Sequence, residues 1–482
     1  MKNSGIFPPE TLSLLEEVYR LSQKNNIRLF LVGGALRDIL ARRLKDNPDL
    51  DFCLRTQAIA FARAAAKKMS AGFVVLDKEH GCARVVKKTA HKTYTLDFTD
   101  FKGKTLEEDL RSRDFTINSI ALELKELFGK KPFIASLIDP HAGKNDLSQH
   151  LIRMITPGGF DDDPLRILRA FSFASLFDFA IEKKTLAAAV RRKSRLGSVA
   201  KERIREELFR ILSSQKPFEC MQQLARHRIL EIVFPEIKAM QKPFKRPYHR
   251  LDVFGHSLLT LKHLEGIIAR SARSEEAGKY LQEEFSAGRP RASLVKLVGL
   301  LHDIGKPRTF RAEKGKVSFH GHERVGAAMI EEIGSRLKLS NAEVRAIKQM
   351  TFCHLRPGYL ATNPVLTKRA KFRFFRDAGN EAVSILLISL ADQRATHGYR
   401  TIERARKRHE RLIRRLVAEY FASLHQKKQL PLVNGNILMK RLGLTPSPLI
   451  GTLLAELREL QAIGKIKTTQ DALQAAAKII AP

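Results

Sequence analysis

Two aspartates separated by one residue are the first candidates for chemistry in this chain. Asp49 and Asp51 lie in the segment PDLDF, at the start of a short apolar run that predicts a β-strand. Because alternate residues of a strand point to the same face, the two carboxylates should lie side by side. Two such carboxylates repel each other unless cations lie between them, and Mg²⁺ ions held there could activate a hydroxyl and grip a triphosphate. Taken alone, the pattern is more often an acidic turn before a strand.

The residues around the acidic pair favour the metal-site interpretation. The segment LFLVGGALRDIL predicts a strand, a turn at Gly33 and Gly34, and a helix with Arg37 in its first turn. Glycine lets the backbone approach a ligand, and helix N-terminal amides suit phosphate. Further along, the alternating segment TYTLDFTDF carries Asp97, which we expect to be a third acid beside the pair. The alternative is that Asp97 is an ordinary outward-facing strand residue.

A second acidic cluster precedes a helical pattern in the segment GFDDDPLRILRAF, residues 159–171. Asp163 and Arg166 are three residues apart, so on a helix their side chains would share one face. A carboxylate accepts from an exocyclic amine and an arginine donates to a ring nitrogen or carbonyl, so the pair could read the edge of a nucleobase. The simpler interpretation is a helix start, with Asp161 or Asp162 as the cap and Pro164 in the first turn.

Histidines and aspartates of the second half form another candidate metal site. The segment LLHDIGKP places His302 and Asp303 after an apolar helix, with His256 upstream and Asp392 downstream. This order resembles the HD phosphohydrolase superfamily, in which imidazole and carboxylate ligands hold a divalent metal such as Mg, Mn or Ni that activates water against a phosphoester. The further candidate ligands are His322 and His354, with His320 as a weaker one.

The charge of the chain predicts a polyanionic partner. Its 482 residues contain 86 Lys and Arg against 51 Asp and Glu, which gives a formal net charge of +35. Basic stretches lie at 191–205, 241–250, 367–377 and 400–416. Part of the last stretch also carries acids and could be a solvated helix face. Four separate stretches favour nucleic acid as the partner, and no obvious amphipathic anchor favours a membrane.

Cysteine usage and the N-terminal segment predict a cytoplasmic protein. Cys53, Cys82, Cys220 and Cys353 are far apart and form no CxxC pair. Such spacing indicates a reducing compartment. No apolar run is long enough to span a bilayer, and the first residues do not resemble a signal peptide.

The pattern of elements predicts an α/β head followed by a long helical body. Short strand-like runs occur at 27–34, 49–54, 72–77, 83–88 and 93–101, and the chain beyond residue 160 is almost entirely helical in pattern. Segment 271–292 is polar and predicts an inserted loop or hairpin. We expect a catalytic head at 1–150, a helical neck at 151–245, an HD-type domain at 246–400 and a C-terminal tail at 401–482.

Five motifs in order resemble the class II tRNA nucleotidyltransferase and bacterial poly(A) polymerase family. They are LVGGALRDIL with DLDF, LEEDLRSRDFTINSIAL, LIDPHAGKNDL, FDDDPLRILRAFSFA and KERIREELFRIL, and they cover residues 27 to 212. The tail from residue 431 also resembles the C-terminus of HD-containing members. The resemblance implies a polymerase-β-like nucleotidyltransferase head, with a small mixed sheet, and an elongated all-α neck and body that includes the HD domain.

The resemblance also implies roles for single residues. Asp49 and Asp51 would hold Mg²⁺, with Asp97 as the third catalytic acid, and Asp163 with Arg166 would be a protein template that selects C or A. Asp139, Arg203 and Glu206 match structural positions, the last two in a motif that braces the base-reading helix. The implied nucleotide-binding residues are Gly33, Gly34, Arg37, Asp38, Arg113, Asp114, Asn118, Asp163, Arg166 and Arg169.

Three departures from the family pattern bear on the product. The spacing from Gly-Gly to DxD is two residues longer than expected, and Ser112 replaces the first arginine of a usual Arg pair. The segment FTDFKGKTL between Asp97 and EEDL is short, which resembles enzymes that add only part of the CCA end, particularly the CC-adding type. The basic segment of poly(A) polymerases after DxD is missing, which favours tRNA over messenger RNA.

These observations predict an enzyme that adds C and A from CTP and ATP to the 3′ end of tRNA. Basic helices would bind the acceptor arm through backbone charge and shape. The alternatives are a CC-adding or A-adding enzyme, a poly(A) polymerase, an HD hydrolase with an RNA-binding head, and a purely RNA-binding protein. We expect no membrane partner, and no obligate protein partner is evident.

Overall fold

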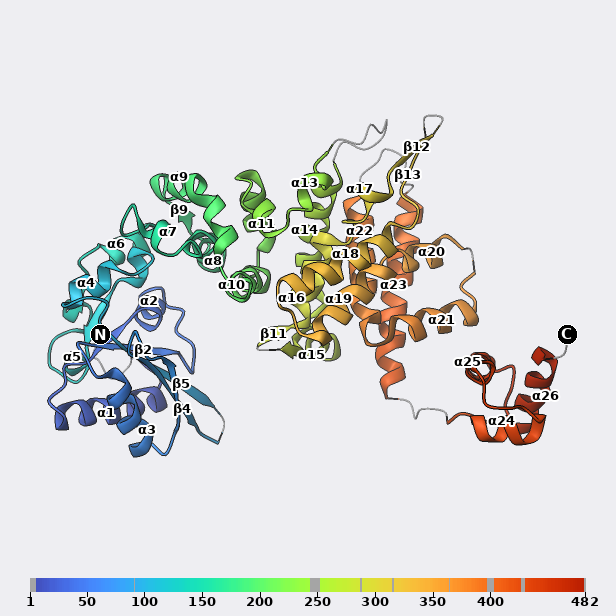
Figure 1. Ribbon diagram of the computed structural model, residues 1–482, viewed down its shortest axis with the longest axis horizontal. Coiled ribbons are helices and arrows are strands. Elements are labelled where there is room, and N and C mark those ends of the chain that lie inside the picture. Colours follow the sequence, from blue (N-terminus) through green and yellow to red (C-terminus); the bar gives the residue numbers. More distant parts are fainter. Residues whose placement is uncertain are drawn as a thin grey trace. The chain divides into compact units, whose positions relative to one another are not determined.

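A computed structural model describes residues 6–90, 92–242, 252–286, 288–313, 316–363, 365–396, 403–425 and 430–480. The basic stretch at 243–250 and the start of the stretch at 400–416 lie outside these ranges. The chain forms two compact units, Met1–Ile211 and Leu212–Pro482 (Figure 1). The division into four domains stays a prediction.

The first unit is built on a seven-stranded mixed sheet with the strand order β3-β4-β5-β2-β1-β6-β7. Strands β2 and β5 are parallel, and every other neighbouring pair in this sheet is antiparallel. The strands are β1 Phe30–Val32, β2 Leu50–Leu54, β3 Gly72–Asp77, β4 Cys82–Lys88, β5 Thr93–Asp100, β6 Ala121–Glu123 and β7 Leu137–Ile138.

Alternation of buried and half-buried residues explains why these segments form strands. Along β5, Tyr94, Leu96 and Phe98 are fully buried, while the residues between them face the other side. Helix α3, Ala58–Lys68, covers the buried face, and its Phe61 ring meets the ring of Phe98 edge to face at 5.4 Å. All five strands that were predicted from the sequence are confirmed, whereas β6 and β7 were not predicted.

Short helices connect the strands and extend the first unit. Helix α4 begins because Thr105 accepts from the amide of Glu108 and acidic residues occupy the first turn. After the sheet, the small parallel pair β8 Leu151–Ile152 and β9 Ala180–Ile181 leads into helices. The helices of this unit are α1 Pro9–Lys24, α2 Gly34–Leu40, α3, α4 Leu106–Arg111, α5 Leu124–Leu127, α6 Gly143–Ser148, α7 Gly159–Asp162, α8 Arg166–Phe177, α9 Lys183–Arg192 and most of α10 Lys201–Ser213.

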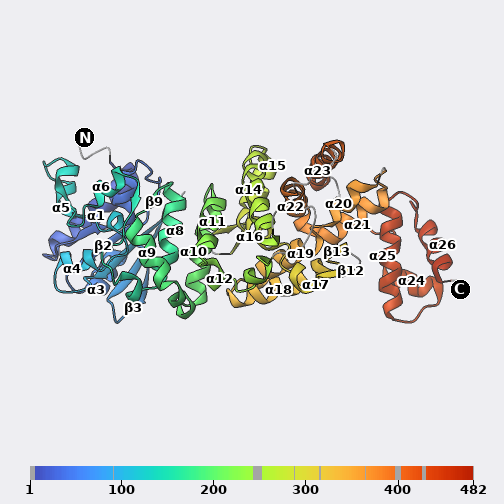
Figure 2. The same ribbon diagram turned by 90° about the horizontal axis from the view of Figure 1, so that it is seen from above.

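The second unit is helical, with α14 Val253–Ser271 packed against α16 Arg291–Leu301 and α22 Ala382–Ala395 at its centre (Figure 2). All of α16 except Ala292 is buried, and α22 is buried from Ala382 to Ala391, so both helices are surrounded by the core of the unit. The other helices are α11 Pro217–Arg226, α12 Leu230–Val233, α13 Ile237–Met240, α15 Glu275–Gln282, α17 Lys306–Thr309, α18 His322–Arg336, α19 Asn341–Cys353, α20 Arg356–Thr362, α21 Lys368–Ala378 and α23 Glu403–Leu424.

Three amphipathic helices at the C-terminal end share a small core of their own. They are α24 Gly435–Leu442, α25 Pro448–Ala462 and α26 Thr469–Ile480. Leu438, Leu453, Leu457 and Ala472 lie at the centre of that core. Helix α25 also contacts α21.

The fold class predicted from the sequence, a mixed-sheet head followed by a helical body, is confirmed. One local prediction needs correction: segment 271–292 contains helix α15 as well as the hairpin of β10 Glu284–Ser286 and β11 Arg289–Pro290. A second hairpin, β12 Arg311–Glu313 with β13 Lys316–Ser318, also interrupts the helical pattern. Among the described helices, none combines the length and apolar character needed to cross a bilayer.

Candidate functional site

All of the residues predicted in the head line one cavity of the first unit, with a volume of about 1060 Å³. The sheet supplies one wall and helices α2 and α8 supply others. The lining includes Gly33, Gly34, Arg37, Asp38, Asp49, Asp51, Asp97, Arg113, Asp114, Asn118, Asp163, Arg166 and Arg169. Their roles stay predictions, but their assembly in one cavity is a property of the fold.

The three acids come together because β2 and β5 are parallel neighbours. Asp51 lies directly opposite Asp97 in the strand register, and Asp49 immediately precedes β2. Burial, followed by the charge of Asp97 and then of Asp49, raises the pKa of Asp51 to about 6. The carboxylates therefore sit in a site that disfavours their own negative charge. Oxygen donors of this kind suit Mg²⁺, so the residues present fit the expected metal.

The turn after β1 brings backbone close to these acids. Gly33 has a φ of 75°, and a Cβ at this position would lie 3.3 Å from both Asp51 Oδ2 and Arg113 Nη1. A larger residue would need a strained backbone and would crowd the acid. Glycine is therefore required here both by conformation and by space.

Arg37 is held in a defined position on the cavity wall. Its Nη1 donates to Asn118 Oδ1 at 2.6 Å, and its Nε donates to Asp38 Oδ1 at 2.8 Å. The guanidinium also lies over the rings of Phe173 and Phe177, with 5.2 and 4.6 Å to the centroids. A buried arginine fixed in this way presents a preorganised positive charge to an anion in the cavity.

A second network joins the motif SRDFTIN to helix α8. Asp114 accepts from Asn118 Nδ2 at 2.9 Å and pairs with Arg169 Nη2 at 2.7 Å. Although burial acts in the opposite direction, Arg169 lowers the pKa of Asp114. Arg113 pairs with Asp109 at 3.1 Å. These contacts keep Asp114 ionised and acceptor-rich at the cavity wall.

The segment around Asp163 differs from the sequence-based prediction. Asp161 and Asp162 lie inside α7 rather than capping the next helix, and Asp161 pairs with Arg192 and Arg195. Asp163 has extended backbone between the helices, and its Oδ1 accepts from the amide of Leu165 at 3.2 Å. Asp163 thus ends α7, because Pro164 keeps the preceding residue out of helical conformation, and α8 begins after Leu165 without a side-chain cap.

Helix α8 begins at Arg166, so Asp163 and Arg166 do not share a helix face as expected. Both nevertheless line the cavity. Arg166 Nη2 donates to the carbonyl of Ser112 at 2.6 Å, and Asp163 Oδ2 accepts from Arg203 Nη2 at 2.8 Å. The pair is therefore brought to the cavity by the α7–α8 turn and by contacts outside the helix.

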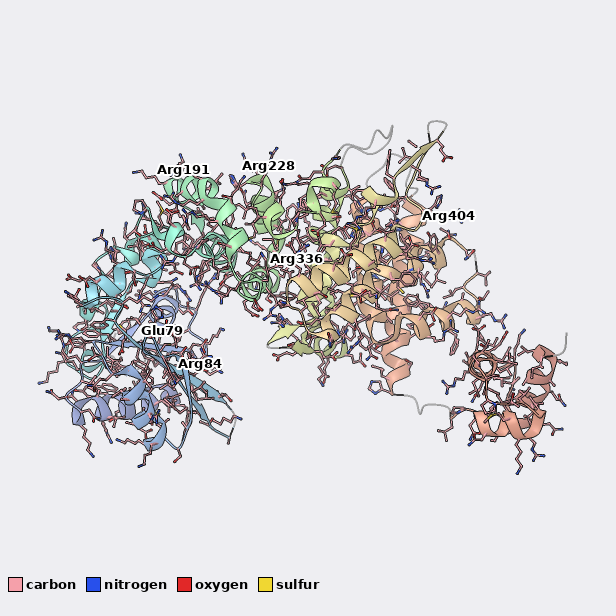
Figure 3. All side chains as sticks on the ribbon, viewed as in Figure 1. Glu79, Arg84, Arg191, Arg228, Arg336 and Arg404 are labelled. Carbon is pink, nitrogen blue, oxygen red and sulfur yellow. The ribbon has the colours of Figure 1, made fainter. Side chains whose placement is uncertain are left out.

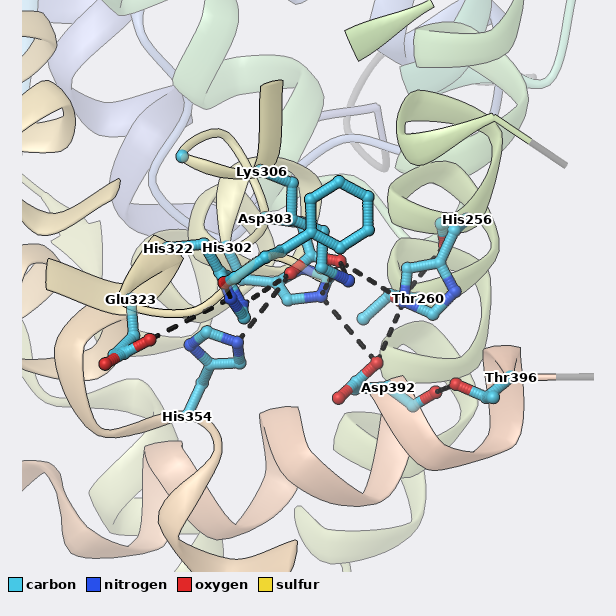
Figure 4. A network of polar contacts seen from close by, with 12 residues as sticks. His256, Thr260, His302, Asp303, Lys306, His322, Glu323, His354, Asp392 and Thr396 are labelled. Carbon is cyan, nitrogen blue, oxygen red and sulfur yellow. Dashed lines mark hydrogen bonds and ion pairs between the residues drawn. The ribbon is translucent and has the colours of Figure 1, made fainter. Parts of the chain in front are cut away.

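The second unit gathers the predicted HD residues into one cluster (Figure 4). His256 Nε2 lies 2.8 Å from Asp392 Oδ1, and His302 Nε2 lies 3.3 Å from Asp303 Oδ2. His322 and His354 also join the cluster, with Nε2 at 3.2 and 3.8 Å from Asp303 Oδ1. Two ligand sets satisfy the spacing of a metal site: His256, His302 and Asp392, and His302, Asp303 and His354.

Backbone carbonyls orient three of these imidazoles. The Nδ1 atoms of His302, His322 and His354 contact the carbonyls of Gly299, Phe319 and Thr351 at 3.0, 2.9 and 2.6 Å. Their buried Nε2 atoms have no hydrogen-bond partner among the described residues. This arrangement is typical of metal-ligating histidines, whose second nitrogen is fixed by an outer contact. The exposed His320 lies outside the cluster.

The electrostatics of the HD cluster are those of a carboxylate-rich centre. Although burial favours the neutral ring, Asp303 and Asp392 raise the pKa of His302 to about 10. Burial, and then the charge of His302, lower the pKa of His354 to about 4. Against the effect of burial, the neighbouring cationic groups hold the pKa of Asp303 and Asp392 well below their usual range. Two ionised carboxylates among imidazoles suit a divalent cation.

Exposed basic side chains are spread over both units. Figure 3 labels Arg191 in α9, Arg228 after α11 and Arg404 in α23, all three exposed. On α23, exposed basic residues recur from Arg404 to Arg415. Such surfaces bind a polyanion chiefly through its backbone charge.

Sequence reasoning missed several residues that shape the sites. Arg84 pairs with Asp97 through two hydrogen bonds of 2.8 Å, and Lys306 Nζ contacts Asp303 Oδ2. Phe173 and Phe177 are the two aromatic rings that pack against the guanidinium of Arg37. The two phenylalanines are four residues apart, a spacing that is typical of the buried face of a helix and gives no sign of a binding site. Only Lys306 could have been suspected from the sequence, because it follows Asp303 by three residues.

Four family models match the chain, and the last two of their ranges overlap. They are the "Poly A polymerase head domain" at 29–153, the "Probable RNA and SrmB- binding site of polymerase A" at 178–241, the "HD domain" at 253–396 and the "tRNA nucleotidyltransferase domain 2" at 328–477. The first match covers Asp49, Asp51 and Asp97, the HD match covers the whole histidine–aspartate cluster, and Asp163 with Arg166 lies between the first two matched ranges.

Curated relatives match nearly the whole chain. An A-adding tRNA nucleotidyltransferase of Deinococcus radiodurans is 33% identical over 92% of this chain and 93% of its own length. A CC-adding tRNA nucleotidyltransferase of Synechocystis sp. is 30% identical over 92% of this chain and 91% of its own. The solved Thermotoga maritima CCA-adding enzyme complexed with tRNA has the same fold, with a TM-score of 0.63, 21% identity and 99% and 98% coverage. The family resemblance predicted from the five motifs is thereby confirmed, and the chain belongs to the tRNA nucleotidyltransferase family.

Proposed function

We propose that this protein adds nucleotides to the 3′ end of tRNA, using CTP and ATP as donors, in the cavity of the first unit. The terminal 3′-hydroxyl oxygen forms a bond to the α-phosphorus of the incoming nucleotide, the bond to pyrophosphate breaks, and the hydroxyl proton is released. Mg²⁺ held by Asp49 and Asp51 would supply charge neutralisation and hydroxyl activation. Arg37 and Arg113 bind the triphosphate, and Asp163 with Arg166 select the base.

One observation carries this proposal. The parallel register of β2 and β5 places Asp51 beside Asp97, in the same cavity that Asp163 and Arg166 line. Metal-binding acids and a base-reading pair are then within reach of one nucleotide. The relatives named as tRNA nucleotidyltransferases over more than nine-tenths of the chain support tRNA as the acceptor.

One assay tests both whether nucleotides are transferred and how many are added. Purified protein is given tRNAs that end at the discriminator base, at C or at CC, each with one labelled nucleotide at a time. Full CCA synthesis predicts C addition to the first two substrates and A addition to the third. Asp51→Ala should lower incorporation by about 10³-fold or more, because the displaced charge is stabilised by the metal. Retained incorporation by Asp51→Ala would contradict the assignment of the site.

Partial addition is the second candidate. Only residues 101–105 connect β5 to α4, which matches the short linker of CC-adding enzymes, and the relatives that match most of the chain are named as A-adding and CC-adding. In the same assay, a CC-adding enzyme stops after two cytidines and an A-adding enzyme uses only the CC-ended tRNA. Continuous adenosine addition would instead identify a poly(A) polymerase.

A separate phosphohydrolase activity is proposed for the HD cluster. Three orphaned imidazole nitrogens and two ionised carboxylates converge there, and they would hold a divalent metal that activates water. The candidate substrates are 2′,3′-cyclic phosphates and phosphomonoesters. Hydrolysis that survives Asp51→Ala but not Asp303→Asn would establish an independent second centre.

A further inference from the structure

The catalytic face of the sheet continues beyond the acids to an exposed flank. A row of residues paired across neighbouring strands runs from Asp51 on β2 to Asp97 on β5, Arg84 on β4 and Val74 on β3. Residues paired in this way point to the same face of a sheet. Val74 is 51% exposed and the side chain of Arg84 is 42% exposed, although β3 and β4 border the catalytic acids.

The opposite face of these strands is occupied by α3. Phe61 of α3 packs on Phe98, which alternates with Asp97 along β5. Arg63 of α3 lies over the ring of Phe73, which alternates with Val74 along β3, at 5.1 Å. The flank on the catalytic face comprises Val74, Arg84, Val86 and Thr95, each at least partly exposed.

The two sides of Asp51 along the sheet carry different groups. The Gly33–Gly34 turn and Arg37 follow β1, which borders β2 on one side, whereas β5, β4 and β3 follow on the other side. Phosphoryl transfer requires the attacking and leaving oxygens to lie roughly in line through the phosphorus. If the triphosphate lies on the β1 side, the attacking hydroxyl must approach from the β5 side, where the flank lies.

The charge of the flank suits RNA. Arg84 donates from Nε and Nη2 to the two oxygens of Asp97, each at 2.8 Å, and its Nη1 lies outside this pair. The carboxylate of Asp97 is thus clamped by a planar, two-point contact that fixes its orientation. A partly exposed guanidinium beside apolar Val74 and Val86 matches a phosphate next to the apolar face of a nucleoside.

We propose that this flank holds the 3′-terminal nucleoside of the acceptor RNA, and that Arg84 is the positioning residue that orients Asp97 toward the attacking hydroxyl. The inference rests on the proposed function and gives the position of the acceptor RNA in the same site. Val74 and Val86 contact the terminal nucleoside, and the free Nη1 of Arg84 faces its phosphate.

The experiment uses the full-length protein and a tRNA whose 3′-terminal nucleoside is 4-thiouridine. Irradiation should cross-link this nucleoside to a peptide that contains residues 72–88, identified by mass spectrometry. Val74→Asp places a negative charge on the flank and should lower the cross-link yield and raise the KM for tRNA about tenfold, with the affinity for nucleotide unchanged within about twofold. Arg63→Ala removes an arginine from the opposite face of the same sheet and should leave all three quantities unchanged.

Arg84 is tested by two variants. Arg84→Ala should lower the single-turnover rate of addition by about tenfold to a hundredfold while nucleotide affinity stays within about twofold, and Arg84→Lys should recover part of the rate. A merely structural arginine would instead change nucleotide affinity and thermal stability together.

Two results would overturn the inference while leaving the proposed function intact. One is active protein whose cross-link falls outside β3 and β4. The other is that Val74→Asp converts an oligomer of the natural protein to monomers but does not change the KM for tRNA. That result would show that the flank binds a second copy of the chain. Protein that transfers no nucleotide to any tRNA would refute the proposed function itself.

Discussion

Nη2 of Arg203 donates a 2.8 Å hydrogen bond to Oδ2 of Asp163, although forty residues separate the two in the chain. The other carboxylate oxygen of Asp163 accepts from the amide of Leu165. Both oxygens therefore have assigned partners, and the carboxylate has a defined orientation at the cavity. The fifth motif is thus in direct contact with the acid that we propose reads the base, as a bracing role would require.

Loss of this brace should relax base selection. We expect Arg203→Ala to reduce the discrimination of CTP and ATP from UTP and GTP by about tenfold, which corresponds to about 1.4 kcal/mol of differential binding. The reason is that Asp163 can then rotate away from the base edge. Single-nucleotide incorporation assays with each of the four nucleotides measure the change. Lys201→Ala removes a cation from the same helix and should not alter selectivity; an equal effect of both variants would contradict the bracing role.

The acids of the head should oppose folding when no metal is bound. The pKa of Asp51 rises from 3.8 to about 6, so the folded chain keeps this proton over a pH range in which the unfolded chain has released it. The contribution of Asp51 to the stability of the metal-free protein should therefore fall as the pH rises from about 4 to 6 and stay lower above it. We expect Asp51→Asn to stabilise the metal-free protein by about 1–3 kcal/mol at pH 7.5.

Denaturant unfolding in the presence of a chelator measures this difference. Addition of Mg²⁺ should then stabilise the natural protein more than Asp51→Asn, because the variant lacks one of the proposed ligands in the head and keeps the HD cluster. A variant that is less stable than the natural protein without metal would show that Asp51 is instead held by favourable contacts.

The HD cluster should bind a divalent metal independently of the head. Asp303 contacts the Nε2 atoms of four imidazoles at 3.2 to 3.8 Å. We expect Asp303→Asn to lower the affinity for Mn²⁺ or Ni²⁺ by about tenfold to a hundredfold, because it removes a charged ligand. Titration monitored by calorimetry gives the affinity, and His320→Ala is the control since that exposed histidine lies outside the cluster. Unchanged metal affinity in Asp303→Asn would contradict the assignment of a metal site to the HD cluster.

The C-terminal helices should depend on one buried carboxylate. Glu459 of α25 is 2% exposed and pairs with Arg369, Arg373 and Arg376 of α21. Glu459→Gln removes the charge that holds these three cations together, so we expect amide hydrogen exchange in α25 to become about tenfold faster. Glu456→Gln on the same helix is the control. Equal exchange in both variants would show that apolar packing alone secures α25.

Local patterns in the sequence determined the elements and the identity of the chemical groups. Alternating apolar residues specified the strands from 72–77 to 93–101, and the order of acids, glycines and histidines in motifs pointed to both candidate sites. These features depend on neighbours within a few residues, so they can be read without the fold. The start of α8 could not be read in this way, because three adjacent aspartates offer equivalent capping signals, whereas the helix begins after Leu165 and none of them caps it.

Contacts between distant segments were decided only by the tertiary structure. The sequence placed Asp97 on a strand, but the parallel pairing of β2 with β5 set it opposite Asp51. The same holds for Arg84, which no motif marks and which reaches Asp97 through the antiparallel register of β4. The register of a sheet depends on which strand faces are buried and on how the chain connects the strands. The sequence therefore supplied the carboxylates and the arginine, and the packing of β2, β4 and β5 decided which of these side chains meet.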